Sequence, residues 1–266
     1  MLSIIVCSRT KVIDDNLYEN IKNTVGCLYE LVIVDNSQNE YSIFEAYNKG
    51  IEASKGEYLC FMHDDVLLHT ENWGNIIIEI FKENKKIGLL GVAGTTVKTK
   101  MPSAWWRCPV ETRHVRLIQH TDHSPTEIFE LGFKNNSLEQ VVVVDGVFMV
   151  ARKVNEIRFN EHIEGFHNYD LNLSFEYIKH DFQVFVTNKV LIEHFSSGTL
   201  NDSWIESTFK IHNIYKDFLP LSVCEQPFIK ALEVVNAKKF IKECFKHGQN
   251  IIAFLTWLKL FNRAPF

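Results

Sequence analysis

The stretch from Gly56 to Thr70, GEYLCFMHDDVLLHT, carries an apolar segment directly into a pair of carboxylates. Five of the six residues from Tyr58 to His63 are apolar or aromatic, and Asp64 and Asp65 follow them at once. In an open parallel sheet, ligands bind at the carboxyl ends of the strands, because the loops there converge on a crevice. The stretch therefore predicts a buried strand of a sheet, with a ligand site at its end.

The first part of the chain alternates between β-rich apolar runs and helical patterns. The apolar runs predict strands at Leu2–Ser8, Glu30–Asn36, Glu57–His63 and Ile87–Gly94. The runs between them predict helices at Asp14–Gly26, Ser42–Ser54 and Asn72–Asn84. Because alternating strands and helices require crossover connections, we expect an α/β fold. Its central sheet should be Rossmann-like and mostly parallel, with helices on both faces.

The rest of the chain is predicted to complete the same fold. Residues 95–136 have few periodic runs, so we expect a loop-rich excursion there. A strand over Val141–Lys153 is broken at Asp145 and Gly146, and a helix and two more strands follow it. The expected organisation is one domain over residues 1–220, with halves at about 1–100 and 101–220, and a helical extension at 221–266.

The composition is that of an ordinary globular protein, with 46% hydrophobic and 23% charged residues among 266. A net charge of −5 argues against nucleic acid as the main partner. The six cysteines are scattered without a CxxC pair, which indicates reduced, cytosolic usage. The N-terminal MLSIIVCSR has no basic leader or cleavage pattern, and no apolar run approaches the roughly 18 residues of a spanning helix. We expect a cytoplasmic protein that does not cross a bilayer.

Polar side chains follow each of the first three predicted strands. They are Ser8 and Arg9, then Asp35 and Asn36, then His63, Asp64 and Asp65. Carboxylates at such a place suit a hard divalent cation that keeps open positions for substrate phosphates. His63 adds a nitrogen ligand, which Mn²⁺ tolerates better than Mg²⁺ does. Two alternatives remain open: these residues are turn formers, or Asp64 or Asp65 caps the next helix without any metal.

The ordered segments SIIVCSR, LVIVDNS and AYNKGIEASKGEYLCFMHDDV resemble the nucleotide-sugar domain of glycosyltransferase family 2, which has the GT-A fold. The resemblance is close over Leu2 to Leu68. It extends more loosely through DGVFMVARK, GFHNYDLNLSFEYIKHDFQVFV and IEHFSSG to about residue 200. It implies that the first half of the domain binds the nucleotide sugar and the second half the acceptor.

The resemblance also implies roles for individual residues on the donor side. Asp35 would hydrogen-bond the nucleotide base, with Ser8, Arg9 and Asn36 around the same pocket and Asn48 and Gly50 on its floor. Asp65 matches the last acid of the family's D-x-D motif, which holds the metal, and Asp64 matches the central position. His63 replaces the usual first Asp, which puts the ribose contact of that position in doubt. His194 falls where many members place a histidine that reaches the metal or the diphosphate.

On the acceptor side, Asp170 matches the acid that supplies the catalytic base, and Glu164 is the reserve candidate. The alternative for Asp170 is a helix N-terminal acid favoured by the macrodipole. Asp145 and Gly146 match the acceptor-side strand, although a glycine needed for a bulge explains half of that pair. Trp105 and Trp106 either stack on a sugar ring or plug the underside of their loop.

Together these residues predict a metal-dependent, inverting glycosyltransferase that uses Mn²⁺ or Mg²⁺. The resemblance favours a uridine or thymidine diphosphate sugar over a guanosine one, with a glycan or lipid-linked acceptor in surface polysaccharide or glycan synthesis. A nucleotidyltransferase is a rival hypothesis, but CSRTKVIDDN lacks the glycine-rich phosphate loop that it would need. A non-catalytic nucleotide-sugar binding module is the other, and it would not need Asp65, Asp170 and His194 together.

The C-terminal extension differs from the rest of the chain in charge. Residues 228–266 hold seven Lys or Arg and two Glu. Apolar residues recur three or four apart from Ala237 to Arg263, which predicts amphipathic helices. These helices are expected to lie on the inner face of a membrane, to pack on the main domain, or to form a homodimer.

Overall fold

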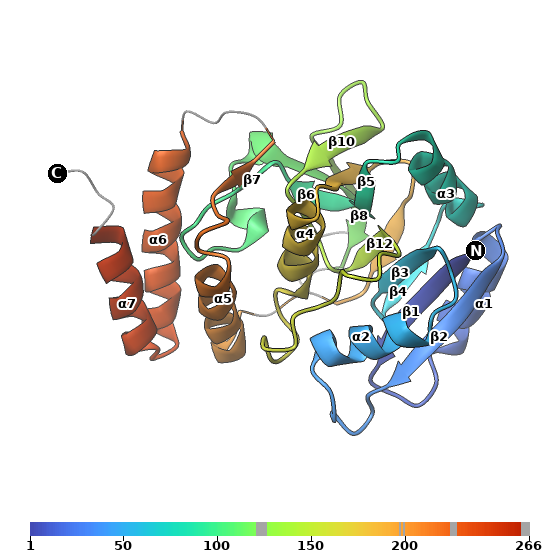
Figure 1. Cartoon of the computed structure of the whole chain (residues 1–266), viewed down its shortest axis with the longest axis horizontal. Coiled ribbons are helices and arrows are strands. Elements are labelled where there is room, and N and C mark those ends of the chain that lie inside the picture. The colour runs from blue at the N-terminus through green and yellow to red at the C-terminus, as the bar shows by residue number, and fades with distance from the viewer. Residues whose placement is uncertain (121–126, 197, 199, 224–227, 262–266) are drawn as a thin grey trace.

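The computed structural model describes residues 1–120, 127–196, 198, 200–223 and 228–261. Its centre is a seven-stranded sheet in the order β10-β13-β5-β12-β3-β1-β2 (Figure 1). The strands of this sheet are β1 (Leu2–Ser8), β2 (Tyr29–Asp35), β3 (Tyr58–Met62), β5 (Ile87–Gly91), β10 (Leu138–Val141), β12 (Phe148–Arg152) and β13 (Gln183–Thr187). All residues of β3 and β5 are buried, as expected for strands covered on both faces.

The central sheet is mixed rather than mostly parallel. β1 pairs in parallel with both β2 and β3, and β13 pairs in parallel with β5. β12 is antiparallel to β3 and to β5, and β10 is antiparallel to β13. The reason is local: the chain enters β12 at the carboxyl end of β3, where Phe148 pairs with Met62, so it runs back along its neighbours.

A second sheet lies beyond the carboxyl end of β5 and was not expected. Its order is β11-β6-β8-β14-β4, with β9 paired to β8. Its strands are β4 (Val66–Leu68), β6 (Ala93–Thr95), β8 (Arg113–Gln119), β9 (Ile128–Leu131), β11 (Val143–Val144) and β14 (Ile192–His194). The predicted strand over Ile87–Gly94 is thus divided at Val92 between the two sheets.

The predicted loop-rich excursion at 95–136 contains more regular structure than its sequence indicates. β8 and β9 lie in it, together with β7 (Val97–Lys98) and the 3₁₀ turns η1 (Trp105–Arg107) and η2 (Val110–Thr112). β7 pairs with β15 (Leu221–Ser222). In β8 only Val115 and Leu117 are buried, so its alternation is short and lies among charged residues.

Helices cover the central sheet at the predicted places: α1 (Asp15–Thr24), α2 (Ile43–Ala53), α3 (Trp73–Glu83) and α4 (Tyr169–Lys179). α2 starts where it does because Ser42 and Glu45 form a reciprocal capping box. It packs closely on β1, since a Cβ at Gly50 would lie 2.3 Å from the Ile5 side chain. α4 is buried along most of its length, including Leu171 and Phe175.

The C-terminal part forms α5 (Asp202–Ile214), α6 (Ile229–Lys246) and α7 (Asn250–Phe261), which stand in a row at one end of the molecule (Figure 1). α6 packs on the main domain: Phe240 and Cys244 join Trp204 of α5 in an apolar cluster. The Glu233 carboxylate accepts hydrogen bonds from the backbone N–H groups of Lys100 and Met101, both at 2.7 Å.

The described cysteines, Cys7, Cys27, Cys60, Cys108 and Cys244, are free thiols. Within the described ranges, no helix has both the length and the apolar character that crossing a bilayer requires.

Candidate functional site

A cavity of about 470 Å³ lies where the ends of β1, β2 and β3 meet. The register explains the convergence, because Ser8 pairs with Asp35 across β1 and β2, and Val6 pairs with Met62 across β1 and β3. The residues after these strands therefore reach one edge of the sheet. The cavity is lined by six predicted residues, Ser8, Arg9, Asn36, His63, Asp64 and Asp65, and by Cys7, Ser37, Asn39, Ile43, Tyr47, Phe166, Tyr169 and Ser196.

Arg9 and Asp64 form an ion pair at the wall of this cavity. The guanidinium Nη2 of Arg9 lies 2.6 Å from Oδ1 of Asp64, and its Nε lies 3.3 Å from Oδ2. The backbone N–H of Arg9 also donates to Oδ2, at 3.1 Å. The pair fixes the segment after β1 to the acidic segment after β3.

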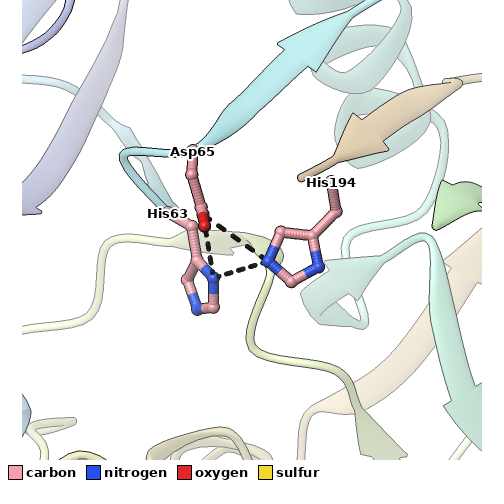
Figure 2. Close-up of side chains that lie close together, drawn as sticks. All are labelled: His63, Asp65 and His194. Carbon is pink, nitrogen blue, oxygen red and sulfur yellow. Dashed lines mark hydrogen bonds and ion pairs between the residues drawn. The ribbon is translucent and has the colours of Figure 1, made fainter. Parts of the chain in front are cut away.

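His63, Asp65 and His194 converge beside this ion pair, and their side chains point toward one another (Figure 2). Oδ1 of Asp65 lies 3.5 Å from Nε2 of His194 and 3.7 Å from Nδ1 of His63. Those two ring nitrogens are 3.2 Å apart. Contact with His194, and next with His63, holds the pKa of Asp65 well below its usual range, although burial opposes this effect.

The remaining ring nitrogens of both histidines have defined partners. Nδ1 of His194 lies 3.0 Å from Oε1 of Gln119, whose amide nitrogen donates to the carbonyl of Ser196 at 2.7 Å. Because the amide oxygen accepts from Nδ1, the Nε2 of a neutral His194 is unprotonated and can accept from Nδ1 of His63 or bind a metal. Nε2 of His63 lies 2.6 Å from the hydroxyl of Tyr169. Metal-binding histidines are typically oriented by such partners, so the donor set fits a divalent metal.

Gln119 and Tyr169 were not predicted as site residues. Gln119 ends β8, inside the segment expected to be loop, so nothing in its surroundings indicated a position next to His194. Tyr169 precedes the predicted base and begins α4, and that adjacency was the available signal.

Asp170 lies in the first turn of α4. It is 9% exposed, and its Oδ1 accepts from the backbone N–H of Leu171 at 2.8 Å. Burial, and next the Asp145 carboxylate, raise the pKa of Asp170 to about 7, against the opposing charge of Lys98. Asp170 itself does not line the 470 Å³ cavity, whereas the adjacent Tyr169 does.

Glu164, the reserve candidate for the base, has surroundings unlike those of Asp170. Its side chain is 87% exposed and lies 3.8 Å from Nζ of Lys210. Glu164 therefore lies on the open surface beside a lysine, whereas Asp170 is buried.

Among the residues predicted for the acceptor side, Asp145, Gly146 and Trp105 lie close together. Oδ2 of Asp145 accepts from the indole N–H of Trp105 at 3.0 Å, and Oδ1 accepts from the N–H of Val147 at 2.9 Å. Gly146 leaves room for a tyrosine, since a Cβ there would lie 2.3 Å from the hydroxyl oxygen of Tyr169.

Of the two alternatives for Trp105 and Trp106, stacking on a sugar or plugging their loop, the structure gives the two residues different surroundings. Trp105 is 6% exposed and bonded to Asp145, so it is a plug rather than a stacking platform. Trp106 is exposed and lines a separate groove of about 660 Å³, together with Phe228 and Lys239. The two indoles meet edge to face, with centroids 6.0 Å apart.

Two donor-side expectations are also corrected, because Asn48 and Gly50 do not line the cavity. The Asn48 amide is fully engaged: it donates to the Phe159 carbonyl and to Glu161, and its oxygen accepts from the Phe159 N–H. Gly50 serves the packing of α2 on β1. Both residues therefore shape the scaffold below the cavity instead of facing a ligand.

Asp35 and Asn36 follow β2 as predicted, but they have different surroundings. Asp35 is exposed, and the backbone N–H of Ser37 donates to its Oδ1 at 2.9 Å. Hydrogen bonding from Ser37 lowers the pKa of Asp35, which keeps it ionised. The Asn36 amide forms paired hydrogen bonds with the backbone of Tyr41, at 2.9 and 3.0 Å, and so closes the loop at the cavity edge.

Comparison with known proteins identifies a family and a fold for the chain. The family model described as "Glycosyltransferase like family" matches residues 3–216. The crystal structure of GalNAc-T7 with UDP, GalNAc and Mn²⁺ is similar at a TM-score of 0.53 and 6% identity, over 80% of this chain and 48% of that one. The crystal structure of S. aureus TarS 1-349 in complex with UDP-GlcNAc is similar at a TM-score of 0.52 and 11% identity, over 92% of this chain and 72% of that one. The comparison with curated proteins finds no match.

The two structural similarities concern the fold alone, and the chain spans about half of the GalNAc-T7 structure. The family match covers most of the chain, from the first strand to the end of α5. This chain therefore belongs to the glycosyltransferase-like family, as its ordered motifs predicted, and it has the fold of the GT-A glycosyltransferases.

Proposed function

We propose that this protein is a metal-dependent, inverting glycosyltransferase that moves a sugar from a nucleoside diphosphate to an acceptor hydroxyl. The observation that carries the proposal is the His63, Asp65 and His194 cluster, whose ligand atoms lie within 4.8 Å of one another at the cavity where three strands end. The cavity volume of about 470 Å³ suits a small ligand such as a nucleotide.

His63, Asp65 and His194 are the residues that would hold the metal. A set of two imidazoles and one carboxylate favours Mn²⁺ over Mg²⁺, which prefers oxygen ligands. The bound ion would act as a Lewis acid that neutralises charge on the departing diphosphate. Tyr169 and Gln119 orient the two imidazoles from behind, through the nitrogens that do not face Asp65.

The other cavity residues suit the nucleotide. Ser8 and Asn36 line the cavity, and Asp35 does not. Asp35 pairs with Ser8 at the ends of the parallel strands β1 and β2, so it is proposed to meet the nucleotide base at the rim of the same place. Arg9 is the cation of this edge and is 73% exposed, which leaves it able to meet a phosphate while it holds Asp64. A uridine or thymidine donor is proposed on the family resemblance, and the two similar structures contain UDP or a UDP-sugar.

Asp170 is the proposed general base. A pKa of about 7 lets its carboxylate accept a proton near neutral pH, whereas an ordinary aspartate is a much weaker base. Asp145 is held by Trp105 and Val147 and is the neighbouring acid with defined hydrogen bonds. We assign proton removal to Asp170 and acceptor orientation to Asp145, because two carboxylates in different environments take different roles.

The proposed acceptor is a glycan or a lipid-linked sugar in polysaccharide or glycan synthesis. It would approach from the side of Asp145, because that acid is partly exposed and neighbours Asp170. A single displacement with Asp170 on the acceptor side inverts the anomeric centre of the transferred sugar.

The experiment is incubation of the protein with radiolabelled UDP- and dTDP-sugars and Mn²⁺, with separation of the products. Slow hydrolysis of the sugar nucleotide to the nucleoside diphosphate, in the absence of an acceptor, is the expected result. A parallel incubation contains a sugar phosphate and a nucleoside triphosphate, and release of pyrophosphate there would instead indicate a nucleotidyltransferase. Binding without any turnover of any donor would indicate a binding module.

A further inference from the structure

α7 presents an uncharged apolar face to solvent at the outer end of the molecule (Figure 1). Ile251, Phe254 and Trp257 are 77%, 56% and 48% exposed. Phe254 stacks on Trp257, and Trp257 stacks on Phe261, with ring centroids 6.2 and 5.5 Å apart. A contiguous exposed face of large aromatic side chains on a globular domain marks an interaction site.

The one charged residue of α7 does not interrupt this face. Lys259 is directed at α5, where its ammonium hydrogen-bonds Asn213 and lies 4.4 Å from the centre of the Phe209 ring. Ala253 and Thr256 are the buried residues of the helix, and Ala253 joins the apolar cluster with Trp204 of α5 and Phe240 of α6.

α6, the partner of α7 in the hairpin, carries the charge of the extension. Its exposed lysines are Lys230, Lys238, Lys239, Lys242 and Lys246, of which Lys246 is paired with Glu243 at 3.1 Å. Its two acids are turned away from solvent: Glu233 accepts from the backbone of the main domain, and Glu243 is 8% exposed and lies 3.4 Å from Arg107. The exposed charge of the hairpin is therefore almost entirely positive.

We propose that the hairpin of α6 and α7 docks the protein on a membrane surface that contains anionic lipids. Apolar and aromatic side chains would enter the boundary between headgroups and acyl chains, and the lysines would meet the lipid phosphates. Tryptophan is enriched at that boundary in membrane proteins, because one end of its ring system is apolar and the other is polar. α7 has 12 residues, so it would lie on a bilayer rather than cross it, which takes about 20.

A membrane accounts for the apolar face of α7 and the lysines of α6 together better than a second copy of the chain does. A dimer would bury the aromatic face against its twin, but it would also bring two sets of lysines together. An anionic lipid surface attracts the lysines and accepts the apolar face at the same time. If the chain transfers sugar as proposed above, this orientation places it beside a lipid-linked acceptor.

The test is co-sedimentation of the full chain with vesicles, and it does not depend on catalysis. The protein should bind phosphatidylcholine vesicles that contain phosphatidylglycerol, at low salt, and should not bind phosphatidylcholine alone. The double variant Phe254→Glu/Trp257→Glu should bind about tenfold more weakly or worse. Leu28→Glu is the matched control, since Leu28 is 75% exposed and lies between α1 and β2, at the end of the molecule away from α7 (Figure 1), and it should bind as the wild type does.

A second measurement keeps the test independent of any folding defect in the double variant. Brominated anionic lipids should quench the fluorescence of the wild type, and the conservative variant Trp257→Phe should bind while losing most of that quenching. Failure of the wild type to sediment with anionic vesicles would overturn the proposal. So would a wild-type dimer that the double variant dissociates, because it would assign the apolar face to a second copy.

Discussion

Nε2 of His63 lies 2.6 Å from the hydroxyl oxygen of Tyr169, and this hydrogen bond joins the end of β3 to the first turn of α4. Gly146 makes the contact possible, since any side chain there would meet the tyrosine. Asp170 is the next residue along the helix. One buried tyrosine thus links the proposed metal ligand His63 to the helix turn that carries the proposed base Asp170.

Tyr169→Phe is expected to weaken the metal site without unfolding the protein. The ring still fills its space, but His63 loses the partner that orients it, so Mn²⁺ affinity should fall about 10- to 100-fold. Isothermal titration with Mn²⁺ measures this. Tyr177→Phe is the control on the same helix, since its hydroxyl donates to the Arg152 carbonyl and not to His63 or His194. Equal losses in both variants would contradict a specific role for Tyr169.

Gly146→Ala should displace Tyr169 and so disturb the same site through packing. A Cβ 2.3 Å from the hydroxyl oxygen cannot be accommodated without a shift of the ring. We expect a loss of stability of about 1–3 kcal/mol and weaker Mn²⁺ binding, measured by thermal unfolding and titration. Gly198→Ala has no atom within 4 Å of its Cβ and should change neither quantity. Normal Mn²⁺ affinity in Gly146→Ala would show that Tyr169 has no influence on the metal.

Asp170→Asn should reduce turnover by roughly 10²–10⁴-fold, because the amide keeps the shape of the carboxylate but cannot accept the proton. Donor binding and Mn²⁺ affinity should remain nearly intact. Glu164→Gln is the matched control and should transfer sugar normally, since Glu164 is 87% exposed. If Glu164→Gln is inactive while Asp170→Asn is active, the base is Glu164 and our assignment of Asp170 is wrong.

The pH dependence of transfer should follow the same carboxyl group. With a pKa of about 7, Asp170 is protonated and inactive as a base below neutral pH, so kcat should rise as pH increases through about 7 and then level off. A rate profile from pH 5.5 to 9 at saturating donor and metal tests this. A rate that is flat across neutral pH would exclude Asp170 as the titrating base.

Stability should show the opposite trend for this group. An unfolded aspartate titrates near pH 4, whereas folded Asp170 keeps its proton up to about 7. Between these values the folded state binds more protons, so the Asp170 contribution to stability falls as pH rises through this window. Asp170→Asn should therefore melt at a higher temperature than the wild type at pH 8, and the difference should shrink toward pH 4. If Asp170→Asn is less stable than the wild type at pH 8, the buried Asp170 carboxylate does not destabilise the folded state as we expect.

Much of the N-terminal half could be predicted from the sequence, because its signals are local. The strands at Leu2–Ser8 and Tyr58–Met62 are continuous apolar runs, and Ser42 with Glu45 marks the start of α2. The acids after β3 are contiguous with their strand, so their position at its carboxyl end followed from the sequence. The family and the GT-A fold were confirmed on the same segments.

The rest depends on contacts between distant residues, which carry no local pattern. His194 and Gln119 meet because β14 and β8 pair, and β8 has only two buried residues to indicate a strand. Asn48 was predicted to face the ligand, but its amide hydrogen-bonds the backbone of Phe159, more than a hundred positions later. The donor, acceptor and base roles remain predictions that the mutants above address.

The most direct test of the account is the metal dependence of donor turnover by the wild type and by Asp65→Ala. Sugar-nucleotide hydrolysis or transfer is measured after treatment with a chelator and again after addition of Mn²⁺. The account predicts that chelation abolishes wild-type activity, that Mn²⁺ restores it, and that Asp65→Ala stays inactive at every Mn²⁺ concentration, while His63→Ala is only weakened. Full activity of the wild type in the presence of the chelator would contradict the central claim.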